Sequence, residues 1–151
     1  MLSYANPHSQ ILMHTQPNTI QQIVIADDNP RALRGLCAIL ATQPGIAVVG
    51  EASQGAEALE LVQTLHPQVV VLDVTMPVMD GLQAARSIKK NWPQTRVILL
   101  SISADHQNQA FETGADGFLV KGCPAIDLIT TILGPNPEKP YKRVSNKTLQ
   151  E

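Results

Sequence analysis

The sequence predicts an α/β fold, in which five parallel strands form one doubly wound sheet in (βα)5 order with helices on both faces. Two observations lead to this prediction. Five short apolar segments each precede a segment whose apolar residues have helical spacing. The third segment, Val69–Asp73, is continuously apolar and rich in β-branched residues until its last position. This composition is typical of a parallel strand that is buried on both faces.

The five expected strands are short runs bounded by turn residues. Aromatic residues make up only 3% of the chain, so Val, Leu, Ile and Ala must fill the core that these runs form. The apolar share of 44% is sufficient for a core at this chain length. In chain order the runs are residues 23–26, 46–50, 69–73, 96–100 and 117–120.

The first three expected helices have recognisable ends. Pro30 opens the first, because the missing N–H of a proline has no helical partner at that position in any case. Ser53 is the expected N-cap of the second helix, and His66–Pro67 end it. Asp80 is the expected N-cap of the third helix, which ends before Trp92–Pro93.

The last two expected helices are less regular. The fourth covers about residues 105–113, and Phe111 is almost its only large apolar residue. Gly114 suits its C-terminal cap. Pro124 opens the fifth helix, which is expected to direct three apolar residues toward the core: Ile126, Ile129 and Leu133.

The length of 151 residues allows one domain with tails. Residues 1–21 are polar and aperiodic and form an expected flexible N-terminal tail, and residues 22–134 form the domain. Residues 135–151 are Pro-rich and are expected to be a C-terminal tail or a truncated linker. The net charge of -2 gives no general case for nucleic acid binding.

Neither the cysteines nor the hydropathy pattern indicates secretion or a membrane. Cys37 and Cys123 lack metal-ligand spacing and are expected to be small apolar residues in helices, without a disulfide. No segment is apolar over the thickness of a bilayer, and the N-terminus lacks the pattern of a signal peptide. A soluble cytoplasmic protein without membrane association is expected.

Charged and hydroxyl residues stand at the ends of four of the expected strands. Asp27 and Asp28 follow the first, Asp73 ends the third, and Ser101 and Lys121 follow the fourth and fifth. The carboxyl ends of parallel strands meet at one rim of the sheet. Three carboxylates at that rim repel one another unless a cation neutralises them. Hard oxygen donors without nearby His or Cys select Mg²⁺ or a similar ion.

Phosphoryl transfer to a carboxylate fits this set of groups, because an aspartate can act as a nucleophile and form an acyl phosphate. The chain has no Gly-rich phosphate loop with a Lys–Ser/Thr signature and no visible Ser-His-Asp or Cys-His set. The expected phosphoryl donor is therefore another protein or a small phosphodonor. Taken singly, each strand-end residue is more often a helix cap, a turn hydroxyl or a solvated charge, and it is their combination that favours the phosphoryl site.

Four motifs follow one another along the domain. They are Ile-Val-Ile-Ala-Asp-Asp-Asn-Pro at 23–30, Val-Val-Leu-Asp-Val-Thr-Met-Pro-Val-Met-Asp-Gly at 70–81, Leu-Leu-Ser at 99–101 and Gly-Ala-Asp-Gly-Phe-Leu-Val-Lys at 114–121. In this combination they resemble the receiver domain of two-component response regulators. The helix at Gly-Leu-Gln-Ala-Ala-Arg (81–86) and the segment Arg34-Gly35-Leu36 most resemble those regulators that carry a C-terminal helix-turn-helix DNA-binding domain. The resemblance implies a flavodoxin-like three-layer sandwich that takes a phosphoryl group from a sensor histidine kinase. It implies no enzyme beyond Mg-dependent self-phosphorylation and self-dephosphorylation.

The resemblance also implies the metal site. Asp73 would be the phosphoacceptor, and Asp28 and Asp73 would be direct Mg²⁺ ligands. Asp27 would act on the ion largely through water, and the main-chain carbonyl of Thr75 would complete the protein ligands.

A switch is implied in the same way. Lys121 would contact the phosphoryl group. Ser101 would bond a phosphoryl oxygen, and Phe118 would then turn inward. A simple core aromatic is the alternative interpretation of Phe118. The stretch from Ser101 to Lys121 is shorter than is usual for this family, so the face of the fourth helix is expected to differ.

Several functions remain open at this point. The first is a phosphorylatable receiver that controls transcription through a missing DNA-binding domain, with no nucleic acid contact of its own. The second is a stand-alone or phosphorylation-independent receiver that acts by protein–protein contact. A homodimer that forms on phosphorylation is one option within the first. A hydrolase of the haloacid-dehalogenase type is less favoured, because its nucleophile follows the first core strand, whereas Asp73 follows the third.

Overall fold

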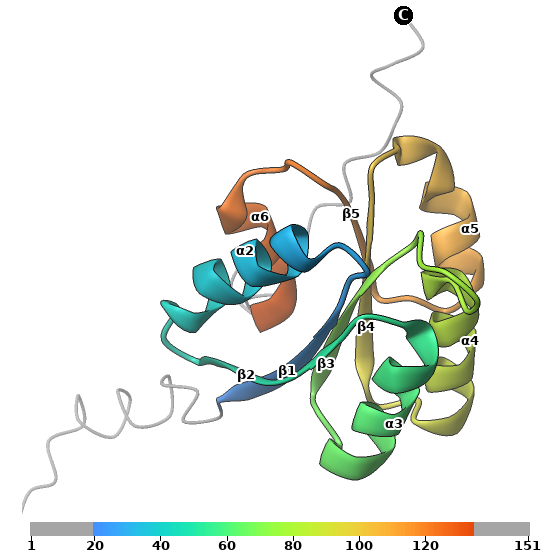
Figure 1. Ribbon diagram of the computed structural model, residues 1–151, viewed down its shortest axis with the longest axis horizontal. Helices are drawn as coiled ribbons and strands as arrows, with labels where there is room; N and C mark the ends of the chain where they lie inside the picture. The colour runs from blue at the N-terminus through green and yellow to red at the C-terminus, as the bar shows by residue number, and fades with distance from the viewer. Residues whose placement is uncertain (1–19, 135–151) are drawn as a thin grey trace, which may run out of the picture.

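The computed structural model describes residues 20–134 and has the predicted α/β fold (Figure 1). Five parallel strands form one sheet in the order β2-β1-β3-β4-β5. Residues 1–19 and 135–151, which are most of the two expected tails, lie outside the described residues. The strands are β1 (Gln21–Ala26), β2 (Ile46–Ala52), β3 (Val69–Asp73), β4 (Arg96–Ser101) and β5 (Gly117–Val120).

Helices connect the strands as expected. Asn29 caps the first one, with its side chain accepting from the N–H groups of Arg31 and Ala32, and Asp80 caps α4. No helix in the described range combines the length and the apolar character that a bilayer crossing needs. The helices are α2 (Pro30–Ala41), α3 (Gly55–Leu65), α4 (Gly81–Asn91), the 3₁₀ turn η1 (Ala104–His106), α5 (Gln107–Glu112) and α6 (Ala125–Leu133).

The sheet is the middle layer of three, with α2 and α6 on one face and α3, α4 and α5 on the other (Figure 1). Strand β3 at its centre is buried at every position, as the sequence predicts. Its side chains alternate between two hydrophobic clusters. Val70 and Leu72 pack on the α3/α4/α5 side, and Val69 and Val71 pack on the α2/α6 side.

The core-facing side of α6 differs from the prediction. Leu128 and Ile132 are buried against the sheet, whereas Ile126 is 60% exposed and Leu133 is 46% exposed. Ile129, the third residue of the predicted face, is partly buried beside Leu128. The helix carries apolar residues on several sides, so periodicity allowed more than one face. The packing of α6 against sheet residues such as Ile98 and Leu100 selects among these faces.

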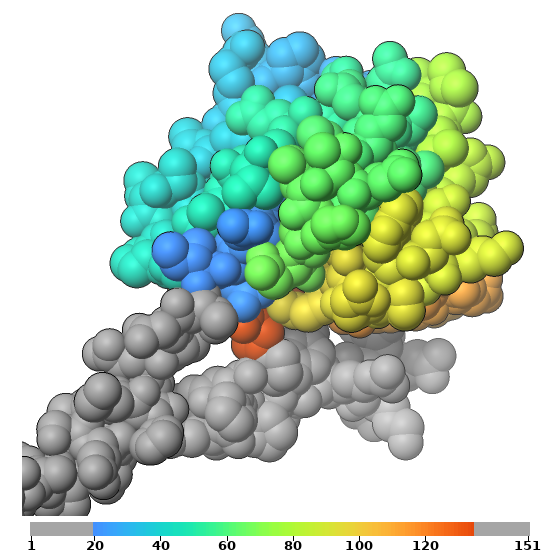
Figure 2. Space-filling view, turned by 90° about the horizontal axis from the view of Figure 1, so that it is seen from below, coloured from blue at the N-terminus to red at the C-terminus, as the bar shows by residue number. Residues whose placement is uncertain are grey.

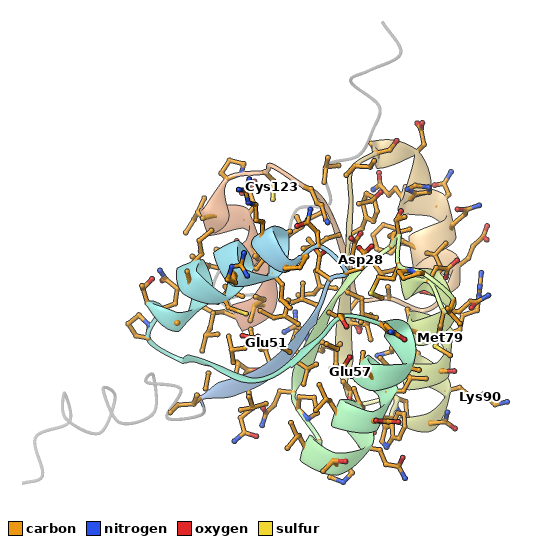
Figure 3. All side chains as sticks on the ribbon, viewed as in Figure 1. Asp28, Glu51, Glu57, Met79, Lys90 and Cys123 are labelled. Atoms are coloured by element: carbon orange, nitrogen blue, oxygen red, sulfur yellow. The ribbon has the colours of Figure 1, made fainter. Side chains whose placement is uncertain are left out.

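Two smaller predictions are also wrong. Ser53 does not cap α3, because the helix begins at Gly55 after Gln54, which makes no side-chain cap bond. The hydroxyl and the N–H of Ser53 instead donate to Glu57, which Figure 3 labels at the start of α3. Cys123 lies in the β5–α6 loop and not in a helix, although both cysteines are free as expected.

The rim at which the strands begin is shown in Figure 2, where the end of α6 lies below the start of β1. Arg96, the first residue of β4, ties α6 to the sheet at this rim. Its guanidinium donates to the carbonyl oxygens of Ile132 at 2.7 Å and Thr131 at 2.6 Å. These carbonyls belong to the last turn of α6, which lacks helical partners and carries partial negative charge. The opposite rim, at which the strands end, holds the candidate site.

Candidate functional site

The register of the sheet gathers the strand ends at one rim. Asp73 pairs with Leu100 in the neighbouring strand, and the next residue, Val74, donates its N–H to the Leu100 carbonyl at 2.8 Å. The N–H of Lys121 donates to the carbonyl of Ser101 at 2.7 Å. Strands β1, β3, β4 and β5 therefore end side by side. Figure 3 shows Asp28 at this rim, where the strand ends converge.

Lys121 joins two buried carboxylates. Its ammonium nitrogen lies 2.8 Å from Oδ2 of Asp27 and 2.8 Å from Oδ2 of Asp73. Asp27 is 1% exposed and Asp73 is 5% exposed, so both carboxylates are largely withdrawn from water. Charge-assisted hydrogen bonds of this length fix the three side chains relative to one another.

The second oxygen of each buried carboxylate is bonded to the main chain. The N–H of Asn29 donates to Oδ1 of Asp27 at 2.9 Å, and the N–H of Thr75 donates to Oδ1 of Asp73 at 3.1 Å. Main-chain N–H groups in the loops after β1 and β3 thus fix the orientation of the two carboxylates. Asp28, in contrast, is exposed, and none of the side-chain hydrogen bonds found within residues 20–134 involves it.

One ammonium group does not neutralise this cluster. Burial raises the pKa of the Asp73 carboxyl, the hydrogen bonds from Lys121 and the Thr75 N–H oppose this rise, and the charge of Asp27 adds to it. Burial alone would lower the pKa of Lys121. Its hydrogen bonds to Asp27 and Asp73 and the charges of both outweigh burial, so the Lys121 pKa is raised. The site therefore has a fixed positive charge and an excess of negative charge.

The acidic residues fit a divalent cation. Asp27, Asp28 and Asp73 each present a carboxylate oxygen, and these oxygens lie within 4.8 Å of one another. Mg²⁺ prefers oxygen donors in proteins, and carboxylate oxygens are among the commonest of them. The exposed Asp28 has its oxygens available, and the peptide of Thr75 lies beside Asp73 because its N–H is bonded there.

The loop after β3 depends on a glycine. Gly81 begins α4, and its N–H donates to the carbonyl of Val74 at 2.9 Å. A Cβ atom at this position would overlap the carbonyl oxygen of Asp73. Asp80, the preceding residue, accepts from the N–H of Gln83 at 2.8 Å and starts the helix. The Asp-Gly pair of the sequence therefore lets α4 start directly against the strand that carries Asp73.

Ser101 and Phe118 occupy the α3/α4/α5 side of the sheet. Ser101 is 1% exposed, and its Oγ lies 2.6 Å from Nδ1 of His106. None of its hydrogen bonds involves the acidic cluster. Phe118 is partly buried and packs against the hydrophobic cluster on that side.

Of the residues that the sequence singles out, the structure brings Asp27, Asp28, Asp73 and Lys121 into one cluster. His106 was not anticipated. A single histidine in a polar, weakly periodic segment carries no signal of its own, and its distance from Ser101 depends on how η1 folds.

A cavity of about 300 Å³ lies beside this cluster, between α2 and the β5–α6 loop. Its lining is largely apolar and includes Leu36, Leu100 and Leu128. Asp27 and Lys121 also line it, so the cavity adjoins the charged site.

Comparison with known proteins agrees with this geometry. A family model described as the response regulator receiver domain matches residues 23–133. The chain is 33% identical over 145 residues to the transcriptional regulatory protein DegU of Brevibacillus brevis, which covers 86% of this chain and 61% of DegU. It is 33% identical over 112 residues to the nitrate/nitrite response regulator protein NarL of Escherichia coli strain K12, which covers 73% of this chain and 52% of NarL.

Solved structures have the same fold. The response regulator domain of Thermotoga maritima CheB superposes with a TM-score of 0.70 at 29% identity, over 76% of this chain and 94% of that chain. A two-component response regulator of the LuxR family from Aurantimonas sp. SI85-9A1 gives a TM-score of 0.70 at 30% identity, over 74% of this chain and 81% of that chain.

The chain spans about half to three fifths of the length of these two curated relatives. The matched region, residues 23–133, includes every strand end described above and most of the described residues. The chain therefore belongs to the response regulator receiver domain family, and residues 23–133 form its receiver domain.

Proposed function

We propose that the domain accepts a phosphoryl group on Asp73 from a sensor histidine kinase, in a Mg²⁺-dependent reaction. The observation that carries this proposal is the bridge from the Lys121 ammonium to Asp73 and Asp27, with a carboxylate oxygen of Asp28 within 4.8 Å of an oxygen of each of these carboxylates. This arrangement supports the proposal, because a carboxylate that can act as a nucleophile, a fixed cation and oxygen atoms that can bind a metal lie together at one rim.

The chemistry is a displacement at phosphorus. A carboxylate oxygen of Asp73 forms a bond to phosphorus while the bond from phosphorus to the kinase histidine nitrogen breaks, and the imidazole leaves. The ammonium group of Lys121 is hydrogen-bonded to the Asp73 carboxylate and provides positive charge for a phosphoryl oxygen. Asp27 retains the second hydrogen bond of that ammonium and so keeps it in place.

Asp27, Asp28 and Asp73, with the main-chain carbonyl of Thr75, would hold Mg²⁺. When bound, the ion neutralises negative charge on the acceptor and phosphoryl oxygens. The excess negative charge of the cluster and the free oxygens of Asp28 favour such an ion.

The kinase has to bring its phosphorylated histidine to Asp73. The apolar cavity between α2 and the β5–α6 loop adjoins Lys121 and suits contact with apolar side chains of that partner. Exposed Ile126 at the start of α6 would extend the same contact.

The output is proposed from the relatives. DegU and NarL are named as transcriptional and response regulators and are longer than this chain. We therefore infer that residues 22–134 are the input domain of a transcription regulator, with 135–151 as a linker to a DNA-binding domain and no nucleic acid contact by the receiver itself. Phosphorylation would then act through a homodimer.

A second function, a receiver that works by protein contact without phosphorylation, is favoured by one observation. Helix α5 has only six residues, and its Phe111 is 45% exposed. A receiver of that kind would keep the cluster at the rim without using it.

Intact mass after incubation with acetyl phosphate and Mg²⁺ tests the proposal. The wild type is expected to gain one phosphoryl group, a chelator is expected to abolish the gain, and Asp73→Asn is expected to show none. Asp127→Asn removes an exposed carboxylate outside the cluster and is expected to behave as the wild type. A wild type that gains nothing while binding Mg²⁺ would favour the phosphorylation-independent function.

A further inference from the structure

The hydroxyl of Ser101 has two partners, and neither belongs to the acidic cluster. Its Oγ accepts from the N–H of Ser103 at 3.1 Å and lies 2.6 Å from Nδ1 of His106. Ser101 is 1% exposed, so water does not take part freely. Ser101, which would bond a phosphoryl group on Asp73, is thus already hydrogen-bonded to other residues.

The direction of the Ser101–His106 hydrogen bond follows from counting donors and acceptors. A hydroxyl has one proton, and within residues 20–134 the only polar atom near Ser101 Oγ that can accept it is Nδ1 of His106. If Nδ1 carried a proton, in the other neutral tautomer or in the charged ring, the buried Ser101 proton would have no acceptor. Buried donors without acceptors are costly and rare. Ser101 therefore donates to Nδ1, and the ring proton is on Nε2.

The short turn η1 holds His106 in place. Oγ of Ser103 accepts from the N–H of Asp105 at 3.1 Å and caps the turn, and the N–H of Gln107 donates to the carbonyl of Ala104. His106 is the last residue of η1, and α5 begins at the next residue. The Ser101 side chain is in this way bonded to the start of α5.

We propose that His106 is a positioning residue that holds the Ser101 hydroxyl in the unphosphorylated state and must release it when Asp73 carries a phosphoryl group. This inference rests on the proposed function of Asp73. On release the Ser101 hydroxyl donates its hydrogen bond to a phosphoryl oxygen instead of to Nδ1; its proton stays on Oγ, and no covalent bond changes. Nδ1 then loses its donor and the start of α5 loses its bond to β4. The Ser101–His106 hydrogen bond is thus replaced by a hydrogen bond from Ser101 to the phosphoryl group. In this way phosphorylation of Asp73 changes how the start of α5 is held.

Substitutions at His106 separate this role from a structural one. His106→Leu removes the acceptor, so the Ser101 hydroxyl is free to bond a phosphoryl oxygen at no loss. His106→Asn keeps an acceptor atom near the position of Nδ1. His106 is only partly buried, so both variants should fold, which circular dichroism can check.

The probe is beryllofluoride with Mg²⁺, which stands in for the phosphoryl group on Asp73. His106→Leu is expected to bind it about 3- to 10-fold more tightly than the wild type, because one ordinary hydrogen bond no longer has to break. His106→Asn is expected to stay near the wild type. In a Ser101→Ala background the His106→Leu change is expected to have no effect, because His106 acts through that hydroxyl.

The imidazole ¹⁵N spectrum gives an independent readout. The chain has four histidines, and the His106 signals are assigned by their loss in His106→Asn. Nδ1 of His106 is expected to be an unprotonated acceptor in the free protein and to shift when beryllofluoride binds. A protonated Nδ1 in the free protein would overturn the inference.

The two proposals fail in different ways. Equal beryllofluoride affinity in the wild type, His106→Leu and His106→Asn would overturn the role of His106 and leave the phosphoacceptor proposal intact. A wild type that does not bind beryllofluoride with Mg²⁺ would overturn the function of Asp73 and this inference with it.

Discussion

Lys121 and Asp73 are 48 residues apart in sequence, yet the lysine nitrogen lies 2.8 Å from Oδ2 of the aspartate at the rim of the sheet. The same nitrogen holds Asp27 at 2.8 Å, so one positive charge serves two buried carboxylates. The Asp73 side chain is oriented by its two hydrogen bonds, one from the Lys121 ammonium and one from the Thr75 N–H. The sharing of one ammonium also leaves the cluster short of positive charge, which is the condition for metal binding.

Replacing the shared cation should destabilise the domain. Lys121→Met leaves the Asp27 and Asp73 carboxylates buried without their positively charged partner, and the free energy of unfolding is expected to fall by about 1–3 kcal/mol. The pKa of Lys121 is raised, so its stabilising contribution is complete below the ordinary value of 10.5 and is lost only as the pH rises through the higher native value. Urea unfolding near neutral pH measures the loss.

The exposed Lys90 provides the control, since Figure 3 shows its side chain directed into solvent. Lys90→Met is expected to change stability by less than about 0.5 kcal/mol. Added Mg²⁺ is expected to restore part of the stability of Lys121→Met, because it supplies the missing positive charge. An equal loss in both variants would contradict this account.

The buried charge of Asp73 should lower stability at neutral pH. Its pKa is raised above the ordinary value of 3.8, mainly by burial, so between that value and the native one the folded state binds more protons than the unfolded state. The contribution of Asp73 to stability therefore falls as the pH rises through this window, and the cost is complete above it. Asp73→Asn is expected to be more stable than the wild type by about 1 kcal/mol near neutral pH without Mg²⁺.

This stability difference should shrink as the pH is lowered through the native pKa of Asp73 toward its ordinary value. Urea midpoints of both proteins across this range measure the trend. A gap between wild type and Asp73→Asn that does not vary with pH would show that titration of Asp73 is not its source.

Mg²⁺ should stabilise the domain through Asp28. Ligand that binds only the folded state raises the free energy of unfolding by about 2.7 kcal/mol at 100 times its Kd. Asp28→Asn removes an exposed ligand oxygen, and we expect at least tenfold weaker Mg²⁺ binding, about 1.4 kcal/mol. Titration calorimetry measures the Mg²⁺ affinity. Asp127 is exposed on α6, and Asp127→Asn should bind Mg²⁺ as the wild type does.

The start of α4 should not tolerate a methyl group. In Gly81→Ala the new Cβ would overlap the carbonyl oxygen of Asp73, so the β3–α4 loop must shift, at a cost of about 1–3 kcal/mol. Phosphorylation by acetyl phosphate is expected to slow as well, because Asp73 moves. Gly35→Ala is the matched control. Gly35 lies inside α2, where a Cβ atom would have no neighbour within 4 Å, and alanine there should stabilise by about 0.5–1 kcal/mol. Thermal unfolding of both variants tests the pair.

The boundaries of the strands were largely predictable because they depend on neighbours in sequence. Val69–Asp73 is apolar without interruption and is buried at every position, and Gly117–Val120 has the predicted limits. Parallel order then brings the strand ends to one rim, so the proximity of Asp27, Asp28, Asp73 and Lys121 followed from topology. Sequence alone thus determined the fold and the members of the cluster.

Tertiary structure decided what depends on packing angles and on short irregular turns. The side of α6 that meets the sheet is that of Leu128 and Ile132, because a helix with apolar residues on several sides has no unique face until it packs. The bond from Ser101 to His106 exists because η1 brings His106 to the end of β4, and no local pattern encodes that turn. The difference between buried Asp27 and exposed Asp28 likewise arises only when β1 is covered by its neighbours, since burial belongs to the assembled fold and not to the residue.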